Sequence, residues 1–227
     1  MHQLGLVIAA TGLAAEARIA ARSEGVKAVA AGGDATRLAS MIESLVADGA
    51  RGIISFGIAG GLRANLKSGA CVVGTSVICD GRTYSADTIW TKCIAVCVPD
   101  AELGAIAGCQ MVVADPAAKK LLLDETGAIA ADMESHVVAR IANDRQMPFA
   151  VLRVIADPVH QRLPSAAVHG LKPDGTPDII AVLKSLGSEP RQLPDLIRVA
   201  IAARRAMAGL FRCHRLLGPG LGFTDLG

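Results

Sequence analysis

Short apolar runs alternate along the chain with longer segments whose apolar residues recur at helical spacing. The runs are rich in Val, Ile and Ala, and a continuous run is typical of a strand buried on both faces of a mostly parallel sheet. We expect strands at residues 4–10, 26–31, 52–61, 110–114, 128–131 and 149–155, a further strand within 88–98, and a loop at 104–108. We expect helices at residues 13–22, 34–46, 115–126, 132–147, 178–186 and 192–217. This order predicts an α/β fold: a single domain with a mixed, mostly parallel central β-sheet flanked by helices.

The segment 127–158 places a carboxylate at each of two positions where a ligand could bind. Glu134 stands where a helix begins, and Asp157 ends a buried strand. In open α/β sheets ligands bind outside the carboxyl ends of the strands, so Met133, Glu134 and Asp157 should meet in one crevice. The alternative interpretation is structural, because Asp and Glu also cap helices and complement helix dipoles at such positions.

A glycine-rich turn ends the strand that starts at Gly52. Glycine lets the backbone turn tightly and approach a ligand closely, because it has no Cβ. Gly32 and Gly33, after the second strand, are further candidates for lining the crevice, although a helix N-cap at Asp34 would explain them equally. The candidate binding residues of the glycine-rich turn are Gly57, Ile58, Ala59, Gly60 and Gly61.

Composition and charge narrow the function classes. The 227 residues suit one domain, which we place at 1–217, followed by a glycine-rich tail at 218–227 that we expect to be frayed. A net charge of +2 gives no indication of a nucleic-acid partner. The six cysteines show no metal-binding or disulfide spacing, which favours free thiols in a reducing compartment. The apolar start of the chain lacks the basic leader of a signal peptide, and no apolar run is long enough to span a bilayer, so we expect a cytoplasmic protein. The cysteine spacing also leads us to expect no metal.

The C-terminal region is basic and amphipathic. Prolines and glycines between residues 160 and 177 indicate a surface excursion, and a long helix follows at 192–217. Four arginines recur at every seventh position: Arg191, Arg198, Arg205 and Arg212. We interpret this helix as docked on the core with its arginines in solvent. The alternative is that the basic segment 191–215 contacts an acidic membrane surface, which would place the protein at the inner face of the membrane.

Four segments resemble the signatures of the nucleoside phosphorylase and nucleosidase superfamily, which includes the methylthioadenosine/adenosylhomocysteine nucleosidases. They are Gly12 to Glu16, Gly57 to Leu62, Ala131 to Ser135 and Arg153 to Asp157. The resemblance implies that Glu134 holds the ribose hydroxyls above Met133, that Asp157 protonates the leaving purine, and that Glu16 orients water. An aspartate at position 157 fits a 6-amino purine such as adenine within the superfamily. The resemblance implies no cofactor. It does imply that the chain forms a homo-oligomer.

The nucleophile divides the superfamily into phosphorylases and nucleosidases. Phosphorylases usually bind phosphate through a Gly-Asp-Pro-x-x-Arg loop and an arginine before the glycine-rich turn, where this chain has Glu16 and Ser55. Water is therefore the favoured nucleophile, and phosphate is the alternative co-substrate if Arg18, Arg63 or Arg82 replaces the missing arginines. Ile58 stands where nucleosidases commonly have a small polar residue.

The chain is most similar to the branch called hopanoid-associated phosphorylases. The resemblance lies in a compact middle region, the segment Ala131 to His136, and the distal Leu171 to Asp178 with its basic helix. That branch is implicated in removing adenine from adenosylhopane, so a small-molecule or lipid-linked adenine nucleoside is the expected substrate. The alternatives are a soluble phosphorylase, a methylthioadenosine-type nucleosidase, and a nucleoside-binding module that has lost catalysis.

Overall fold

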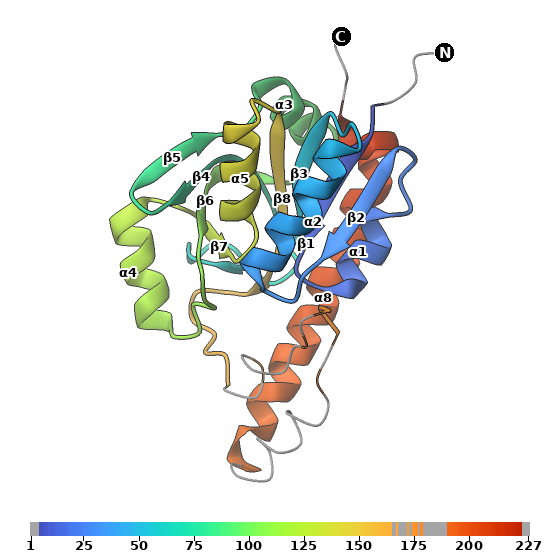
Figure 1. Ribbon diagram of the computed structural model, residues 1–227. Coiled ribbons are helices and arrows are strands. Elements are labelled where there is room, and N and C mark those ends of the chain that lie inside the picture. The colour runs from blue at the N-terminus through green and yellow to red at the C-terminus, as the bar shows by residue number, and fades with distance from the viewer. Residues whose placement is uncertain are drawn as a thin grey trace.

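The structure is a computed structural model that describes residues 5–164, 167, 172, 174–176, 178 and 190–223. It is an α/β domain with a central eight-stranded mixed sheet, as the sequence predicts (Figure 1). The helix expected at 178–186 lies outside the described residues. The strands are β1 Val7–Thr11, β2 Val26–Ala30, β3 Gly52–Gly61, β4 Cys71–Cys79, β5 Arg82–Ser85, β6 Glu102–Gly108, β7 Ala130–Asp132 and β8 Phe149–Asp157. The helices are α1 Ala14–Ala20, α2 Ala35–Ala47, α3 Thr88–Cys97, α4 Pro116–Thr126, α5 Ser135–Asp144 and α8 Leu193–Leu217, with 3-10 turns η1 Pro190–Gln192 and η2 Pro219–Gly222.

The strand order is β2-β1-β3-β7-β6-β4-β5, and β8 pairs with both β3 and β4. Strands β1, β2, β3 and β8 run parallel to one another. Strand β4 is antiparallel to β8 and parallel to β6, and β7 is antiparallel to β3. Because β1, β3 and β8 are parallel, their carboxyl ends lie together at one edge of the sheet, which is the lower edge in Figure 1.

Two hydrophobic cores pack against opposite faces of the sheet. Along β8, Val151 and Ile155 belong to the core under α2 and α5, whereas Leu152 and Val154 belong to the core under α3 and α8. This alternation is the period-two pattern of a strand buried on both sides. The continuous apolar runs of β1, β3 and β8 are therefore read correctly from the sequence as central strands.

The middle of the chain differs from the expectations. The segment expected to contain a strand at 88–98 is helix α3, because the Asp87 side chain accepts the backbone N–H of Trp90 at 2.7 Å and caps a helix that buries Trp90 and Ile94. The expected loop at 104–108 is part of strand β6. Its Gly104 is there for packing, since a Cβ would come within 2.7 Å of Ile129.

The prediction of a strand at 110–114 is also wrong, because these residues form the irregular connection from β6 to α4. Met111 and Val112 are exposed, and the apolar character that suggested a strand instead belongs to the rim of a cavity.

Helix α8 docks on the sheet through its second half only. The buried residues are Ala202, Ala206, Leu210, Cys213 and Leu217. The four arginines that recur at every seventh position are exposed. This confirms the docked interpretation of the helix. The first half extends beyond the lower edge of the sheet in Figure 1 and exposes Leu193, Ile197 and Ile201. Within the described residues, no helix is both long and apolar enough to cross a membrane.

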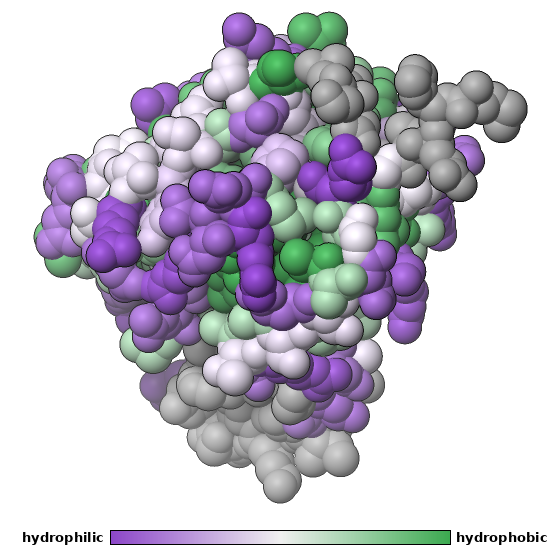
Figure 2. Space-filling view, turned by 45° about the horizontal axis from the view of Figure 1, so that its top comes forward, coloured by the Kyte–Doolittle hydropathy of each residue, from purple (hydrophilic) through white to green (hydrophobic). Residues whose placement is uncertain are grey.

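The chain after α8 is not frayed over residues 218–223, contrary to expectation. Phe223 packs edge-on against Trp90 with ring centroids 4.7 Å apart, and Trp90 Nε1 donates to the Leu221 carbonyl at 3.0 Å. Leu221 is fully buried. The apolar side chains fill the space beside α3, which outweighs the flexibility of the glycines around them. On the face shown in Figure 2, the coloured residues are mostly hydrophilic or near neutral in hydropathy, and apolar residues gather near its centre and at its top.

Candidate active site

A cavity of about 240 Å³ opens at the carboxyl edge of the sheet. Its walls come from the segments that follow β1, β2, β6 and β7, from the ends of β3 and β8, and from α4. Of the residues singled out from the sequence, the lining includes Glu16, Glu134, Asp157, Met133, Ile58, Ala59, Gly60, Gly32 and Gly33. Gly57 and Gly61 are not part of the lining. The topology therefore brings the carboxyl groups of Glu16, Glu134 and Asp157 to one cavity, although the first and the last are 141 residues apart in the chain.

Glu16 is held by backbone groups from two loops. Its Oε2 accepts the N–H groups of Gly12 at 3.0 Å and Leu13 at 2.8 Å, and its Oε1 accepts the N–H of Ile58 at 2.8 Å. Burial raises the pKa of Glu16, and Arg153 and the three N–H donors oppose the rise. A carboxylate has about four acceptor positions, so three backbone donors leave one for a water molecule. Glu16 thus both caps α1 and faces the cavity.

The Glu134 side chain does not cap α5, so the helix-capping interpretation is wrong for this residue. The Oδ1 of Asp132 accepts the backbone N–H groups of Glu134 at 3.0 Å and Ser135 at 2.7 Å, so Asp132 serves as the cap. The Glu134 side chain makes no capping hydrogen bond. Its carboxyl group is therefore available to the cavity.

Arg153, which the sequence did not single out, lies at the centre of the buried charges. Its Nε is 2.7 Å from Asp132 Oδ2, and its Nη2 is 3.2 Å from Glu134 Oε2. Nη2 also donates to Ser55 Oγ at 2.5 Å, and Nη1 donates to the Ile58 carbonyl at 3.3 Å. The signal available in the sequence was a charged residue inside an otherwise apolar strand. A side chain of that kind needs buried partners.

One guanidinium group faces three carboxyl groups in this cluster, so ionising all three would leave uncompensated negative charge. Burial raises the pKa of Glu134 to about 8; Arg153 opposes the rise, whereas Asp132 and Glu16 add to it. Glu134 therefore gains or loses its proton close to neutral pH.

Two glycines make room for this cluster. A Cβ on Gly12 would lie 2.6 Å from Glu134 Oε1, and a Cβ on Gly57 would lie 2.6 Å from Arg153 Nη1 and 2.8 Å from Glu16 Oε1. Neither glycine has a positive φ. The sequence correctly indicated close approach at the glycine-rich turn, but at Gly57 the group that approaches is the buried charge cluster.

Asp157 lies at the other end of the site beside Lys119, a second residue that the sequence did not single out. Lys119 Nζ is 2.6 Å from Asp157 Oδ2, and its side chain is fully buried. Burial raises the pKa of Asp157, and the neighbouring ammonium group opposes the rise. No helix starts at Asp157, so its carboxylate is not a helix cap.

The positions that would bind phosphate in a phosphorylase are otherwise engaged. Ser55 is fully buried, and its Oγ accepts hydrogen bonds from Arg153 Nη2 and from Ser135 Oγ, the latter at 2.9 Å. Arg18, Arg63 and Arg82 are exposed and do not line the cavity. In the described part of the chain, Lys119 is the one cationic lining residue, and it is paired with Asp157. In the same part, no cluster of His, Cys, Asp or Glu could hold a metal ion.

Comparisons with known proteins find one family model and several solved structures that are similar to this chain. Residues 88–185 match a family model described as "Phosphorylase superfamily". A 5′-methylthioadenosine/S-adenosylhomocysteine nucleosidase from S. pneumoniae, solved with a transition-state inhibitor, is 13% identical with a TM-score of 0.63, over 93% of this chain and 99% of that chain. A putative nucleosidase of the same name from Borrelia burgdorferi, bound to adenine, is 16% identical with a TM-score of 0.61, over 86% of this chain and 99% of that chain.

Futalosine hydrolase of Helicobacter pylori is 14% identical with a TM-score of 0.60, over 88% of this chain and 99% of that chain. The curated proteins contain no match. At these identities the solved structures establish the fold. Together with the family model, they confirm the resemblance to the nucleoside phosphorylase and nucleosidase superfamily.

Proposed function

We propose that this chain, which shares the fold of the nucleosidases and matches the phosphorylase superfamily, cleaves the N-glycosidic bond of an adenine nucleoside with water as the nucleophile. The observation that carries the proposal is the convergence of Glu16, Glu134 and Asp157 on one cavity. Breaking this bond requires three things: stabilising positive charge on the sugar, protonating the leaving base, and supplying a nucleophile. We assign one of these tasks to each of the three carboxyl groups.

Glu134 and Met133 form the proposed ribose site. Met133 lines the cavity, and its Cε would be 2.9 Å from a Cβ on Gly33, so the absence of that Cβ lets the methionine lie there. Glu134 accepts the ribose hydroxyl groups. When ionised, it also stabilises the positive charge that develops on the sugar in the transition state.

Glu16 and Asp157 carry the proton transfers. The C1′–N9 bond breaks, its electron pair moves onto the purine, and Asp157 gives a proton to N7. Water held by Glu16 attacks C1′ and loses a proton to that carboxylate. The products are adenine and the free sugar, and both carboxyl groups return to their starting state by exchange with solvent.

The charge of the site favours water over phosphate. Phosphate carries up to two negative charges, and binding it needs free donors, usually arginines or lysines. Within the described residues of the site, Arg153 is already shared among carboxylates and Lys119 is paired with Asp157. A phosphate ion beside Glu16 would meet uncompensated negative charge.

We propose a lipid-linked nucleoside, adenosylhopane, as the substrate. The support is the resemblance of the chain to the hopanoid-associated branch and the apolar side chains at the same edge of the molecule as the cavity. Leu193, Ile197 and Ile201 recur at every fourth position on the part of α8 that extends past this edge, and Met111 is exposed at the rim (Figure 1). A polycyclic tail leaving the cavity would meet apolar surface there. Contact of the basic segment 191–215 with an acidic membrane, and assembly into a homo-oligomer, remain predictions.

The experiment measures adenine released by the purified protein from adenosylhopane and from methylthioadenosine, each with and without phosphate. Asp157→Asn removes the proposed acid, and Asp124→Asn, at an exposed position of α4, is the matched control. We expect release without phosphate, loss of about 10²-fold or more in Asp157→Asn, and no change in Asp124→Asn.

Three other results would change the proposal. Strict phosphate dependence would make the protein a phosphorylase. Release from methylthioadenosine but not from adenosylhopane would overturn the lipid-linked substrate. Adenine binding without release from either nucleoside would favour the nucleoside-binding module.

A further inference from the structure

Lys119 is the only residue of α4 that is fully buried, although it carries a charge. Its neighbour Lys120 is exposed. Taking an ammonium group out of water costs several kcal/mol unless it is well paired, and an apolar side chain at the same position would be buried without that cost. The side chain therefore needs an explanation beyond the packing of the helix.

All acceptors of Lys119 belong to the end of β8 and the turn that follows it. Nζ lies 2.6 Å from Asp157 Oδ2 and 3.1 Å from the Asp157 carbonyl oxygen. It also lies 3.1 Å from the carbonyl oxygen of Pro158 and 3.2 Å from that of Gln161. An ammonium group has three N–H donors, so these four acceptors account for all of them. The lysine fixes both the Asp157 carboxyl group and the backbone beyond it.

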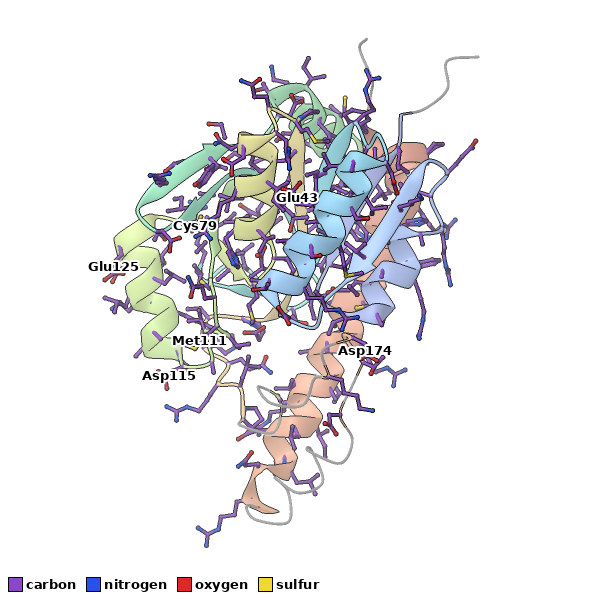
Figure 3. All side chains as sticks on the ribbon, in the orientation of Figure 1. Glu43, Cys79, Met111, Asp115, Glu125 and Asp174 are labelled. Atoms are coloured by element: carbon purple, nitrogen blue, oxygen red, sulfur yellow. The ribbon has the colours of Figure 1, made fainter. Side chains whose placement is uncertain are left out.

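The other surroundings of Asp157 carry little charge. Gly60 of β3 lies behind the carboxyl group, where a Cβ would be 3.1 Å from Oδ2. The loop from β6 to α4 and the turn after β8 contribute Asp115 and Arg162, which pair with each other at 2.6 Å. Arg162 is exposed and Asp115 is half-buried. Figure 3 shows Asp115 and Met111 at the lower end of α4, beside the first turns of the helix. Of the described residues, Lys119 is the one charged group that acts on the pKa of Asp157.

We propose that Lys119 is a positioning residue for the leaving purine: it holds the Asp157 carboxyl group by Oδ2, directs Oδ1 to the base, and stabilises the carboxylate that proton donation leaves behind. The inference rests on the proposed function. In the step itself, the proton on Oδ1 moves to purine N7 as the C1′–N9 electron pair enters the ring. The negative charge then left on Asp157 lies beside an ammonium group that is already in place. Without that group, burial alone would make the acid hold its proton too tightly.

The test compares Lys119→Met with Lys120→Met, which removes the same charge from the same helix at an exposed position. The pKa of Asp157 is followed by ¹³C NMR of its carboxyl carbon, assigned with Asp157→Asn. Adenine release from adenosylhopane or methylthioadenosine, whichever the wild type cleaves, and the Kd of adenine are measured on the same proteins. In Lys119→Met we expect the pKa of Asp157 to rise by at least about one unit and kcat to fall about 10- to 100-fold. In Lys120→Met we expect no change in any of these quantities.

Suppose that the wild type is active and Lys119→Met folds. An unchanged pKa of Asp157 or an unchanged kcat in this variant would then overturn the inference about Lys119 and leave the proposed function standing. Thermal unfolding of each variant shows whether it is folded. If Lys119→Met does not fold, Lys119→Gln, which keeps a donor but removes the charge, is measured in the same way. A wild type that neither releases nor binds adenine would overturn the proposed function. The NMR comparison would still decide whether the lysine acts on the carboxyl group.

Discussion

Replacing Glu134 by glutamine should stabilise the protein at alkaline pH while removing its activity. Glutamine has the size of a protonated glutamate and can still accept a hydrogen bond from Arg153, but it never ionises. The carboxyl group is buried, since Glu134 is only 7% exposed, and it lies beside Asp132 and Glu16 with a single guanidinium group for all three. The wild-type protein should therefore lose stability wherever Glu134 must ionise in the folded state.

The size and direction of the effect follow from linkage. Folding raises the pKa of Glu134 from 4.5 to about 8. Between these values the folded state binds the proton and the unfolded state does not, so stability falls as pH rises. At about 1.36 kcal/mol for each pKa unit, the difference between glutamine and wild type should be near zero below pH about 4.5. It should reach about 3 kcal/mol at pH about 7 and about 5 kcal/mol above pH about 8.

The assay is urea unfolding of both proteins at several pH values from acid to alkaline. Glu125→Gln, at an exposed position of α4 that is labelled in Figure 3, is the control and should shift stability by less than about 0.5 kcal/mol at every pH. Adenine release should fall about 10²-fold or more in Glu134→Gln, because the sugar loses its carboxylate. Stability curves for Glu134→Gln and wild type that run parallel across this range would refute the reasoning.

Other predictions concern the charge cluster and the C-terminal segment. Gly57→Ala should lower the free energy of unfolding by about 1–3 kcal/mol and reduce kcat, because its Cβ would lie 2.6 Å from Arg153 Nη1; urea unfolding and turnover measure the two effects. Arg153→Met should cost about 3–5 kcal/mol at neutral pH, and less in acid where the carboxylates take up protons, which unfolding at two pH values tests. Trp90→Phe should cost about 1–3 kcal/mol by leaving the Leu221 carbonyl without its donor, and an unchanged Tm would contradict this. The kcat/KM for adenine release should rise with pH toward about 8 as Glu134 ionises, and a flat profile over that range would show that the ionised form is not required.

The local pattern of apolar and polar residues determined most of the fold and the positions of the carboxyl groups in the site. The apolar runs of β1, β3 and β8 identify central strands because strands buried on both faces cannot carry polar side chains without buried partners. Once those strands are parallel, their carboxyl ends share an edge, and Asp157 at the end of β8 must lie near it. Glu134 follows β7, which is antiparallel to β3, and Glu16 was identified through the family resemblance.

Only the tertiary structure decided the segments and partners that depend on distant neighbours. Residues 88–97 carry β-branched side chains, yet they form a helix because Asp87 caps it and Trp90 fits beneath the C-terminal residues Leu221 and Phe223. Gly104 suggested a loop, although its position in β6 is set by Ile129.

Arg153 and Lys119 are the clearest cases of what the sequence could not decide. Lys119 is an ordinary charged residue in the sequence, and Arg153 stands out only as a charge inside an apolar strand. Each acquires its role from burial beside carboxylates. Lys119 is separated from Asp157 by 38 residues, and Ser55 from Arg153 by 98. Periodicity reports which side of an element faces inward, but the field of a buried charge depends on which groups the completed fold places within a few ångströms. The sequence therefore determined where the carboxylates lie, and the tertiary structure decided the cations that set their protonation.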